Sequence, residues 1–159
     1  MAGKEASGFF NSDASLLQGA NYILTLSQHT DSDALNKISD IVKEFGCSVI
    51  ITDSNAHDKI IAYTSQLAHI VSSSYIKSPT VQLEKGFTGG SFQDMTRVAL
   101  LNENMWANLF LLNKDNIIRE IDNLTEKLQQ YKDAICGEDK KLLVDLLSKG
   151  KEIKQKHLK

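Results

Sequence analysis

The chain has 159 residues, 42% of them hydrophobic, and a formal net charge of -2. A chain of this length forms one large domain or two small ones and has enough apolar content to bury a core. The small net charge indicates neither nucleic acid nor an anionic membrane surface as the main partner. The sequence has no charged-then-apolar leader and no apolar run of about 18 residues, so we expect a cytoplasmic protein that does not span a membrane.

The first third of the chain alternates strand-like and helix-like patterns. "NYILTL" (21–26) and "CSVIIT" (47–52) predict strands, and "DSDALNKISDIVKEFG" (31–46) predicts a helix with Asp31 as N-cap and Gly46 as C-terminal stop. Strand, helix and strand with short connections indicate a βαβ unit with parallel strands. Two strands do not form a stable parallel sheet alone. We therefore expect residues 1–54 to be the end of a larger α/β domain.

The rest of the chain, residues 55–159, is predicted to be helical. Residues 54–78 predict one helix, and Asp58, Ser65, His69 and Ser72 fall on one flank of its apolar stripe. The stripe itself, expected to face the core, consists of Ile60, Ile61, Thr64, Leu67, Ala68, Val71 and Tyr75.

Beyond a loop or a broken helix start at 78–91, helix resumes near Phe92. A second helix is predicted from Met105 to Ile135, roughly 45 Å long at 1.5 Å per residue. Its apolar stripe needs a partner, in part a second subunit. Gly137 ends this helix, and a short amphipathic helix follows. The fold class is mainly α.

Several catalytic and cofactor motifs are absent from the sequence. No G-x-G-x-x-G follows a strand, and there is no Walker-type loop, G-x-S-x-G elbow or Cys/His metal cluster. Cys47 and Cys136 lie far apart, without metal-ligand spacing, and are interpreted as reduced structural residues.

The stretch "GGSFQDMTRVA" (89–99) places Arg97 three residues after Asp94. An ion pair with Asp94 would stabilise a helix by only about 0.2–0.5 kcal/mol. Near the N-terminal end of a helix, an arginine is disfavoured by the helix dipole, but with free backbone N–H groups it forms an anion site. We therefore expect Arg97 to bind a carboxylate or a phosphate.

Two further residues have competing interpretations. Spacing alone makes His69 more typical of a satisfied core or interface histidine than of a ligand contact. Trp106, the single tryptophan, is either a core aromatic residue or the wall of a pocket or subunit contact.

Together these motifs resemble the prephenate dehydrogenase family, including its arogenate-using members. The resemblance rests on "MAGKEASGF", "GANYILT", "HDKIIAYTSQLAHIV", "GGSFQDMTRVA" and "ENMWANLFLLNKDNI", in this order, and covers the chain up to about Ile135. It implies a Rossmann-like dinucleotide-binding domain ending near residue 54, followed by a helical substrate-binding and dimerisation domain at 55–159. It also implies NAD or NADP as cofactor, prephenate or arogenate as substrate, a homodimer, and tyrosine biosynthesis as the pathway.

The resemblance implies roles for individual residues. Arg97 would bind a substrate carboxylate, with Asp94 and Gln93 supporting it. Ser65 and His69 match the serine and second histidine of the family's "S-H-L-P-H" helix, here "SQLAH", in which Gln66 and Ala68 replace a histidine and a proline. The other implied substrate-binding residues are Gly90, Trp106 and Glu5.

The family's catalytic histidine belongs to a His-Pro pair directly before the "MAG" motif, which here begins at Met1. No residue of this sequence takes that role, and the glycine-rich nucleotide motif is also absent. We therefore expect the C-terminal part of a prephenate dehydrogenase, inactive by itself. The alternative is a non-catalytic helical dimer that binds aromatic carboxylates or a partner protein, without nucleic acid, membrane or metal.

Overall fold

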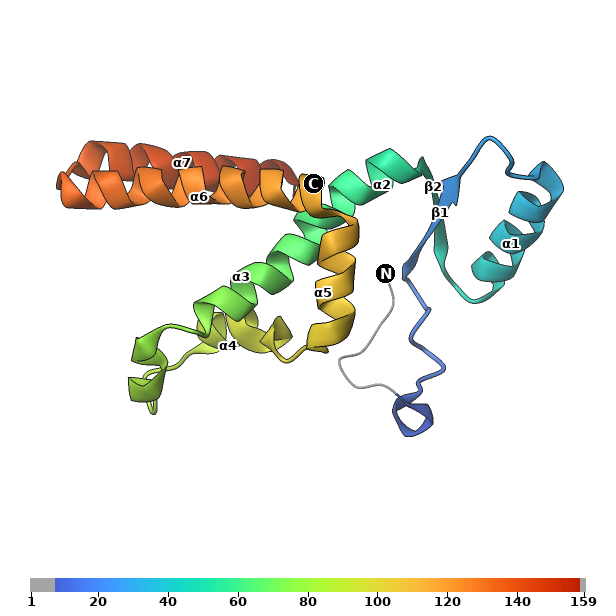
Figure 1. Cartoon of the computed structure of the whole chain (residues 1–159), viewed down its shortest axis with the longest axis horizontal. Helices are drawn as coiled ribbons and strands as arrows, with labels where there is room; N and C mark the ends of the chain where they lie inside the picture. Colours follow the sequence, from blue (N-terminus) through green and yellow to red (C-terminus); the bar gives the residue numbers. More distant parts are fainter. Residues whose placement is uncertain (1–7, 158–159) are drawn as a thin grey trace. The chain divides into compact units, whose positions relative to one another are not determined.

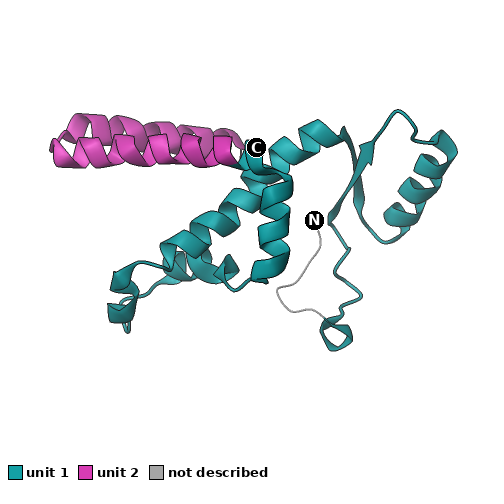
Figure 2. Ribbon diagram, in the orientation of Figure 1, with its two compact units in different colours: residues 1–117 teal, residues 118–159 magenta. Residues whose placement is uncertain are grey.

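The computed structural model describes residues 8–157 and is shown as a ribbon in Figure 1. The chain divides into two compact units, residues 1–117 and residues 118–159 (Figure 2). This division does not test the domain boundary expected at residue 54, which stays a prediction.

Unit 1 begins with a βαβ unit. Strands β1 (Asn21–Leu26) and β2 (Ser48–Asp53) pair in parallel, with Asn21 opposite Ser48, and helix α1 (Ser32–Glu44) connects them. At the start of α1, Asp31 Oδ1 accepts a hydrogen bond from the Ala34 N–H at 2.7 Å. Gly46 follows the helix with φ 78, a left-handed conformation that favours glycine. The predicted strands, helix and both caps are confirmed.

The remainder of unit 1 is helical. A 3₁₀ turn, η1, precedes the sheet, and α6 begins at the end of the unit. The elements are η1 (Phe9–Asn11), α2 (Ser54–Ile61), η2 (Ala62–Gln66), α3 (Leu67–Tyr75), η3 (Pro79–Leu83), α4 (Gly90–Thr96), η4 (Arg97–Ala99), α5 (Glu103–Leu112) and α6 (Lys114–Cys136). Helix α3 packs against α4 and η4. The mainly α class, with a small parallel sheet before the helices, is confirmed.

The helix predicted at 54–78 contains a π-helical turn, η2 (Ala62–Gln66). Within it the Leu67 N–H bonds to the carbonyl oxygen of Ala62, five residues earlier. One additional residue in a turn rotates the following side chains by about 100° relative to a straight helix. The predicted apolar stripe is wrong in part: Ala62 is fully buried, whereas Ile60 before the turn and Tyr75 after it are 57% and 49% exposed.

The predicted long helix is also interrupted. Helices α5 and α6 are separated by Asn113, whose φ of -117 and ψ of 27 are not helical. The prediction of one continuous helix about 45 Å long is therefore wrong.

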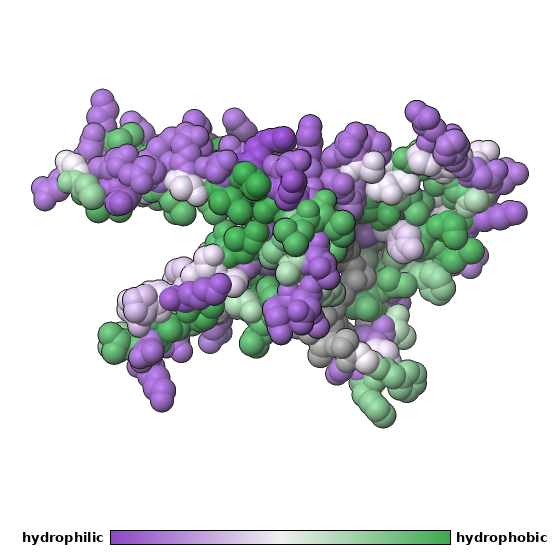
Figure 3. All heavy atoms as spheres, viewed as in Figure 1, coloured by the Kyte–Doolittle hydropathy of each residue, from purple (hydrophilic) through white to green (hydrophobic). Residues whose placement is uncertain are grey.

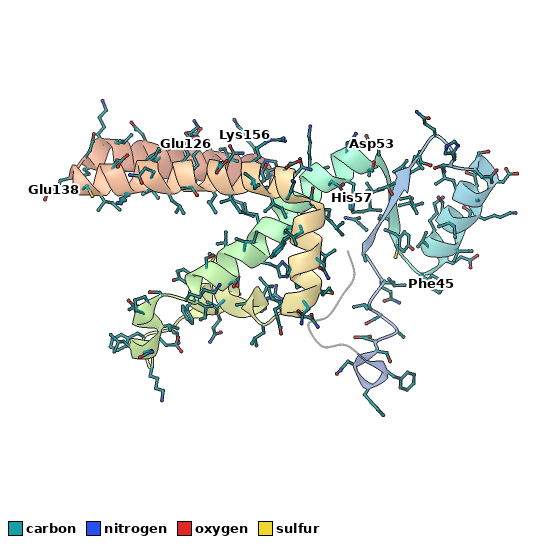
Figure 4. The ribbon with its side chains drawn as sticks, viewed as in Figure 1. Phe45, Asp53, His57, Glu126, Glu138 and Lys156 are labelled. Carbon is teal, nitrogen blue, oxygen red and sulfur yellow. The ribbon has the colours of Figure 1, made fainter. Side chains whose placement is uncertain are left out.

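Unit 2 is a helical hairpin in which α7 (Lys140–His157) follows α6 after a short connection. The Asp139 N–H bonds to Ala134 O and the Glu138 N–H to Ile135 O, at 2.9 and 3.1 Å, forming a Schellman motif. Its left-handed residue is Glu138, with φ 49, at the tip of the hairpin (Figure 4), and not the preceding Gly137. Helix α7 is longer than the short helix expected from the sequence.

Few apolar side chains are buried within the described residues. On the sheet, Ile50 and Ile51 are 44% and 53% exposed, and on α6 Ile118 is 54% exposed. Figure 3 shows hydrophobic side chains on the visible surface of both units. The buried apolar residues are Val42, Cys47, Ala62, Leu67, Ile117 and Ala134. So much exposed apolar surface indicates contact with further protein surface.

None of the helices within residues 8–157 combines the length and the apolar character needed to cross a bilayer.

The left-handed Glu138 yields a stability prediction. Glu138→Gly is expected to raise the free energy of unfolding by about 0.5–1 kcal/mol, because a left-handed conformation is unfavourable for an L-residue with a Cβ. Lys132→Gly, in the interior of α6, is the matched control and is expected to lower it by about 0.5–1 kcal/mol. Urea unfolding measures both free energies. Equal losses of stability in the two variants would contradict the left-handed conformation of Glu138.

Candidate functional site

The candidate site is built around the ring of His69 on α3. Its Nδ1 lies 2.8 Å from the carbonyl oxygen of Ser65, one turn earlier in η2. A carbonyl oxygen only accepts, so Nδ1 carries the hydrogen, and in the neutral ring Nε2 is left as an acceptor. The contact therefore sets both the orientation of the ring and the nitrogen it offers.

An aromatic stack holds His69 against α5. The rings of His69 and Trp106 are 3.8 Å apart between centroids, with an interplanar angle of 27°. Phe110, one turn further along α5, lies 5.5 Å from Trp106. Trp106 is thus stacked on the histidine, which is compatible with both interpretations left open by the sequence, and its role in binding stays a prediction.

A network of side-chain amides joins the same two parts of unit 1. Gln66, in the π-helical turn, is only 5% exposed. Its Nε2 donates to the carbonyl oxygen of Leu109 at 3.2 Å, and its Oε1 accepts from Asn113 Nδ2 at 2.7 Å. Asn113 Nδ2 also donates to the carbonyl oxygen of Asp58 at 2.8 Å. Both hydrogens of the Asn113 amide are therefore used across elements far apart in sequence.

This network explains why α5 ends where it does. The backbone N–H of Asn113 bonds to Phe110 O at 3.3 Å, a tightened last turn that does not use the carbonyl of Leu109. Gln66 satisfies that carbonyl instead. The buried contact between Gln66 and Asn113 thus joins the π-helical turn to the break between α5 and α6.

Arg97 lies at the end of α4, where it is the C-cap residue and the first residue of η4. The expected placement near a helix N-terminus is therefore wrong, because α4 begins at Gly90 and ends at Thr96. At the C-terminal end a cation is favoured by the helix dipole. Arg97 is exposed, and η4 packs against the helix that carries His69.

The other predicted site residues are distributed around α4. Gln93 and Asp94 are exposed on α4, and a Cβ added to Gly90 would meet no atom within 4 Å. The packing of the described residues therefore does not require glycine at position 90. Glu5 lies outside the described residues.

Within residues 8–157, the two helix starts that follow a strand do not suit the pyrophosphate of a dinucleotide. Both helices that follow a strand begin with a capping aspartate: Asp31 Oδ1 accepts from the Ala34 N–H, and Asp53 Oδ1 (Figure 4) from the Ala56 N–H. A carboxylate at each helix start opposes the binding of a pyrophosphate there. Within residues 8–157 no group of three or more His, Cys, Asp or Glu side chains is arranged to hold a metal ion.

Two features escaped sequence reasoning. The Gln66–Asn113 pair has no local signal except a glutamine and an asparagine inside helix-like runs. His57, on α2 (Figure 4), has its Nδ1 2.9 Å from Asp58 Oδ1 and lines a hollow of about 370 Å³ beside β1 with Tyr22 and Cys47. In the sequence, the available signal for this histidine was the acidic residue next to it, Asp58.

The fold defines a mainly helical part that follows a βαβ unit. Two family models match the chain, "Prephenate dehydrogenase, nucleotide-binding domain" at residues 1–51 and "Prephenate dehydrogenase, dimerization domain" at residues 53–149. The chain belongs to the prephenate dehydrogenase family.

Curated relatives agree with this assignment. The prephenate dehydrogenase of Bacillus subtilis is 29% identical over 144 residues, covering 87% of this chain and 39% of that protein. The cyclohexadienyl dehydrogenase of Zymomonas mobilis is 29% identical over 152 residues, covering 91% of this chain and 52% of that protein. This chain therefore spans about half the length, or less, of the curated relatives it matches.

Solved structures share the fold. The prephenate dehydrogenase of Aquifex aeolicus, in complex with hydroxyphenyl propionate and NAD+, superposes with a TM-score of 0.86 at 31% identity, covering 100% of this chain and 57% of that one. The arogenate dehydrogenase of Synechocystis superposes with a TM-score of 0.79 at 22% identity, covering 98% and 59% of the two chains, which shows a common fold alone.

The amide network yields a second stability prediction. Asn113→Asp keeps the shape of the side chain but replaces the donor that serves Asp58 O and Gln66 Oε1 with an acceptor. It is expected to lower the free energy of unfolding by about 1–3 kcal/mol, because buried acceptors lose their partner. Asn123→Asp, exposed on α6, is the control and should stay within about 0.5 kcal/mol. Equal changes in the free energy of unfolding for the two variants, measured with denaturant, would show that the network does not hold the π-helical turn against the end of α5.

Proposed function

We propose that this chain supplies the substrate-binding wall and the subunit contact of an NAD(P)-dependent prephenate dehydrogenase. The reaction converts prephenate, or arogenate in the related activity, by oxidative decarboxylation, giving 4-hydroxyphenylpyruvate from prephenate in tyrosine biosynthesis. Residues 1–54 belong to its nucleotide-binding domain and residues 55–159 to its helical domain. The observation that carries the proposal is the oriented His69 stacked on Trp106, in a chain of this family.

Binding of the substrate rests on three side chains. The planar guanidinium of Arg97 binds a carboxylate through two parallel N–H···O bonds. His69 Nε2 accepts a hydrogen bond from a polar group of the substrate, and Trp106 covers the apolar ring and excludes water. Ser65 and Gly90 border the bound molecule, while Gln93, Asp94 and Glu5 support it.

The chemistry of hydride transfer lies outside these residues. The capped helix starts offer no site for the dinucleotide phosphates, so the chain's own contribution is to bind and orient the substrate. We infer that the chain by itself is inactive, because its sequence has neither the His-Pro pair nor the glycine-rich nucleotide motif.

The exposed apolar residues support this function over a free-standing, non-catalytic dimer. Tyr22, Ile50 and Ile51 of the two-stranded sheet are 41%, 44% and 53% exposed, as expected for strands that belong in a larger α/β domain. On the helices, Tyr63 and Leu112 are 64% and 84% exposed, which supports a subunit contact there.

The activity test compares two proteins. The chain alone is expected to give no NADH from prephenate and NAD, whereas a fusion to the nucleotide-binding domain of the Bacillus subtilis relative is expected to give NADH, since only the fusion has the catalytic histidine and the nucleotide motif. Turnover by the chain alone would contradict the inactivity. A folded fusion that binds NAD but does not turn over would contradict the proposed reaction.

Binding is tested directly with Trp106 as the reporter, because it is the only tryptophan. Hydroxyphenyl propionate is expected to change its fluorescence, and Arg97→Ala to weaken binding roughly 10- to 100-fold, since a charge-assisted contact contributes about 1.5–3 kcal/mol. Arg119→Ala, which removes the other arginine, is the control and should bind as the unchanged chain does. An unaltered affinity in Arg97→Ala would mean that Arg97 does not bind the carboxylate.

A further inference from the structure

Gln66 is a buried polar side chain that none of the proposed substrate contacts uses. Its carboxamide makes hydrogen bonds to residues 43 and 47 positions later in the chain. The carbonyl oxygen of Leu109 only accepts, so the atom of Gln66 that faces it is the nitrogen, and Oε1 is left to accept from Asn113 Nδ2. Asn113 Oδ1 in turn accepts from Asn116 Nδ2 at 2.8 Å. The orientation of both amides is therefore determined by their partners.

One path from Gln66 to the candidate site runs through the backbone. The peptide group that joins Ser65 to Gln66 is planar, so the carbonyl oxygen of Ser65 and the nitrogen of Gln66 move as one unit. That oxygen lies 2.8 Å from His69 Nδ1 and determines which ring nitrogen carries the hydrogen. A displacement of Gln66 therefore lengthens or misaligns the contact at the edge of the ring.

A second path runs through α5. Trp106 and Leu109 lie three residues apart in this helix, within one turn. Because they share a turn, the hydrogen bond from Gln66 to the carbonyl oxygen of Leu109 also fixes the distance of the Trp106 ring from η2. Trp106 stacks on the His69 ring with 3.8 Å between centroids. Gln66 thus constrains the face of the histidine ring as well as its edge.

We propose that Gln66 is a positioning residue for the candidate site. Its two hydrogen bonds hold both constraints on the His69 ring, the carbonyl contact at the edge and the stack on the face. Gln66 thereby fixes the direction of Nε2, the acceptor offered to a ligand. The effect on ligand binding rests on the function proposed above, whereas the effect on the ring requires no ligand. A purely structural Gln66 would change the free energy of unfolding and leave the ring as it is.

The test uses the full chain with isotope-labelled histidine. The imidazole nitrogen resonances report the tautomer of His69, and the shielding of its ring protons reports the stack on Trp106. Gln66→Met keeps the length of the side chain but makes neither hydrogen bond. This variant is expected to reduce the shielding, to mix the two tautomers, and to weaken binding of hydroxyphenyl propionate roughly 3- to 10-fold, as for the loss of one hydrogen bond.

Two controls separate positioning from stability. Val42→Ala, in the core of the βαβ unit, is expected to lower the free energy of unfolding but to leave the His69 resonances and the ligand affinity unchanged. In the unchanged chain, the side-chain amide hydrogens of Gln66 are expected to exchange with water far more slowly than those of Gln155, which is exposed on α7. The exchange measurement does not depend on the folding of any variant.

Three outcomes would overturn the proposal. The first is unaltered His69 resonances or unaltered ligand affinity in folded Gln66→Met. The second is an equal change in the His69 resonances of Val42→Ala, because the resonances would then report stability alone. The third is equally fast exchange of the Gln66 and Gln155 amides. Failure of hydroxyphenyl propionate to bind the unchanged chain would instead contradict the proposed function, and the ring resonances would still decide the role of Gln66.

Discussion

The contact between the amides of Gln66 and Asn113 is the constraint on which the arrangement of unit 1 depends. Asn113 Nδ2 donates to Gln66 Oε1 and to the carbonyl oxygen of Asp58, while Gln66 Nε2 donates to Leu109 O. These bonds tie the π-helical turn to the junction of α5 and α6. Because a buried amide left without partners is costly, the network permits one relative placement of the two segments. It thereby holds Trp106 against His69.

The π-helical turn couples that packing to the chemistry of the candidate site. Gln66 and Ser65 are neighbours in η2, so the residue that anchors the turn adjoins the one whose carbonyl accepts from His69 Nδ1. π-Helical turns cost stability relative to a regular helix and are found frequently at functional sites. Here the turn buries the side chain of Gln66 and presents the carbonyl oxygen of the preceding residue, Ser65, to the histidine.

Many large apolar side chains lie on the surface of the described residues. These side chains are exposed both on the sheet and along the helices. The described residues therefore leave unburied much of the apolar surface that the sequence pattern predicts to be buried. The family models assign the two regions to a nucleotide-binding domain and a dimerization domain. The second description refers to a contact between subunits in the family, and exposed apolar residues lie on both regions.

Local sequence determined the elements whose signals lie within a few residues. The Asp31 cap, the Gly46 stop and the parallel strands around α1 follow from side chains and backbone groups that are neighbours in the chain. The ordered motifs also indicated the family before any fold was known. Tertiary structure decided the phase of α3, the break at Asn113 and the position of Arg97 at the end of α4. The reason is physical. Helical periodicity assumes an uninterrupted helix, whereas the contact between Gln66 and Asn113 joins residues far apart in the chain, at the two places where predicted helices are interrupted.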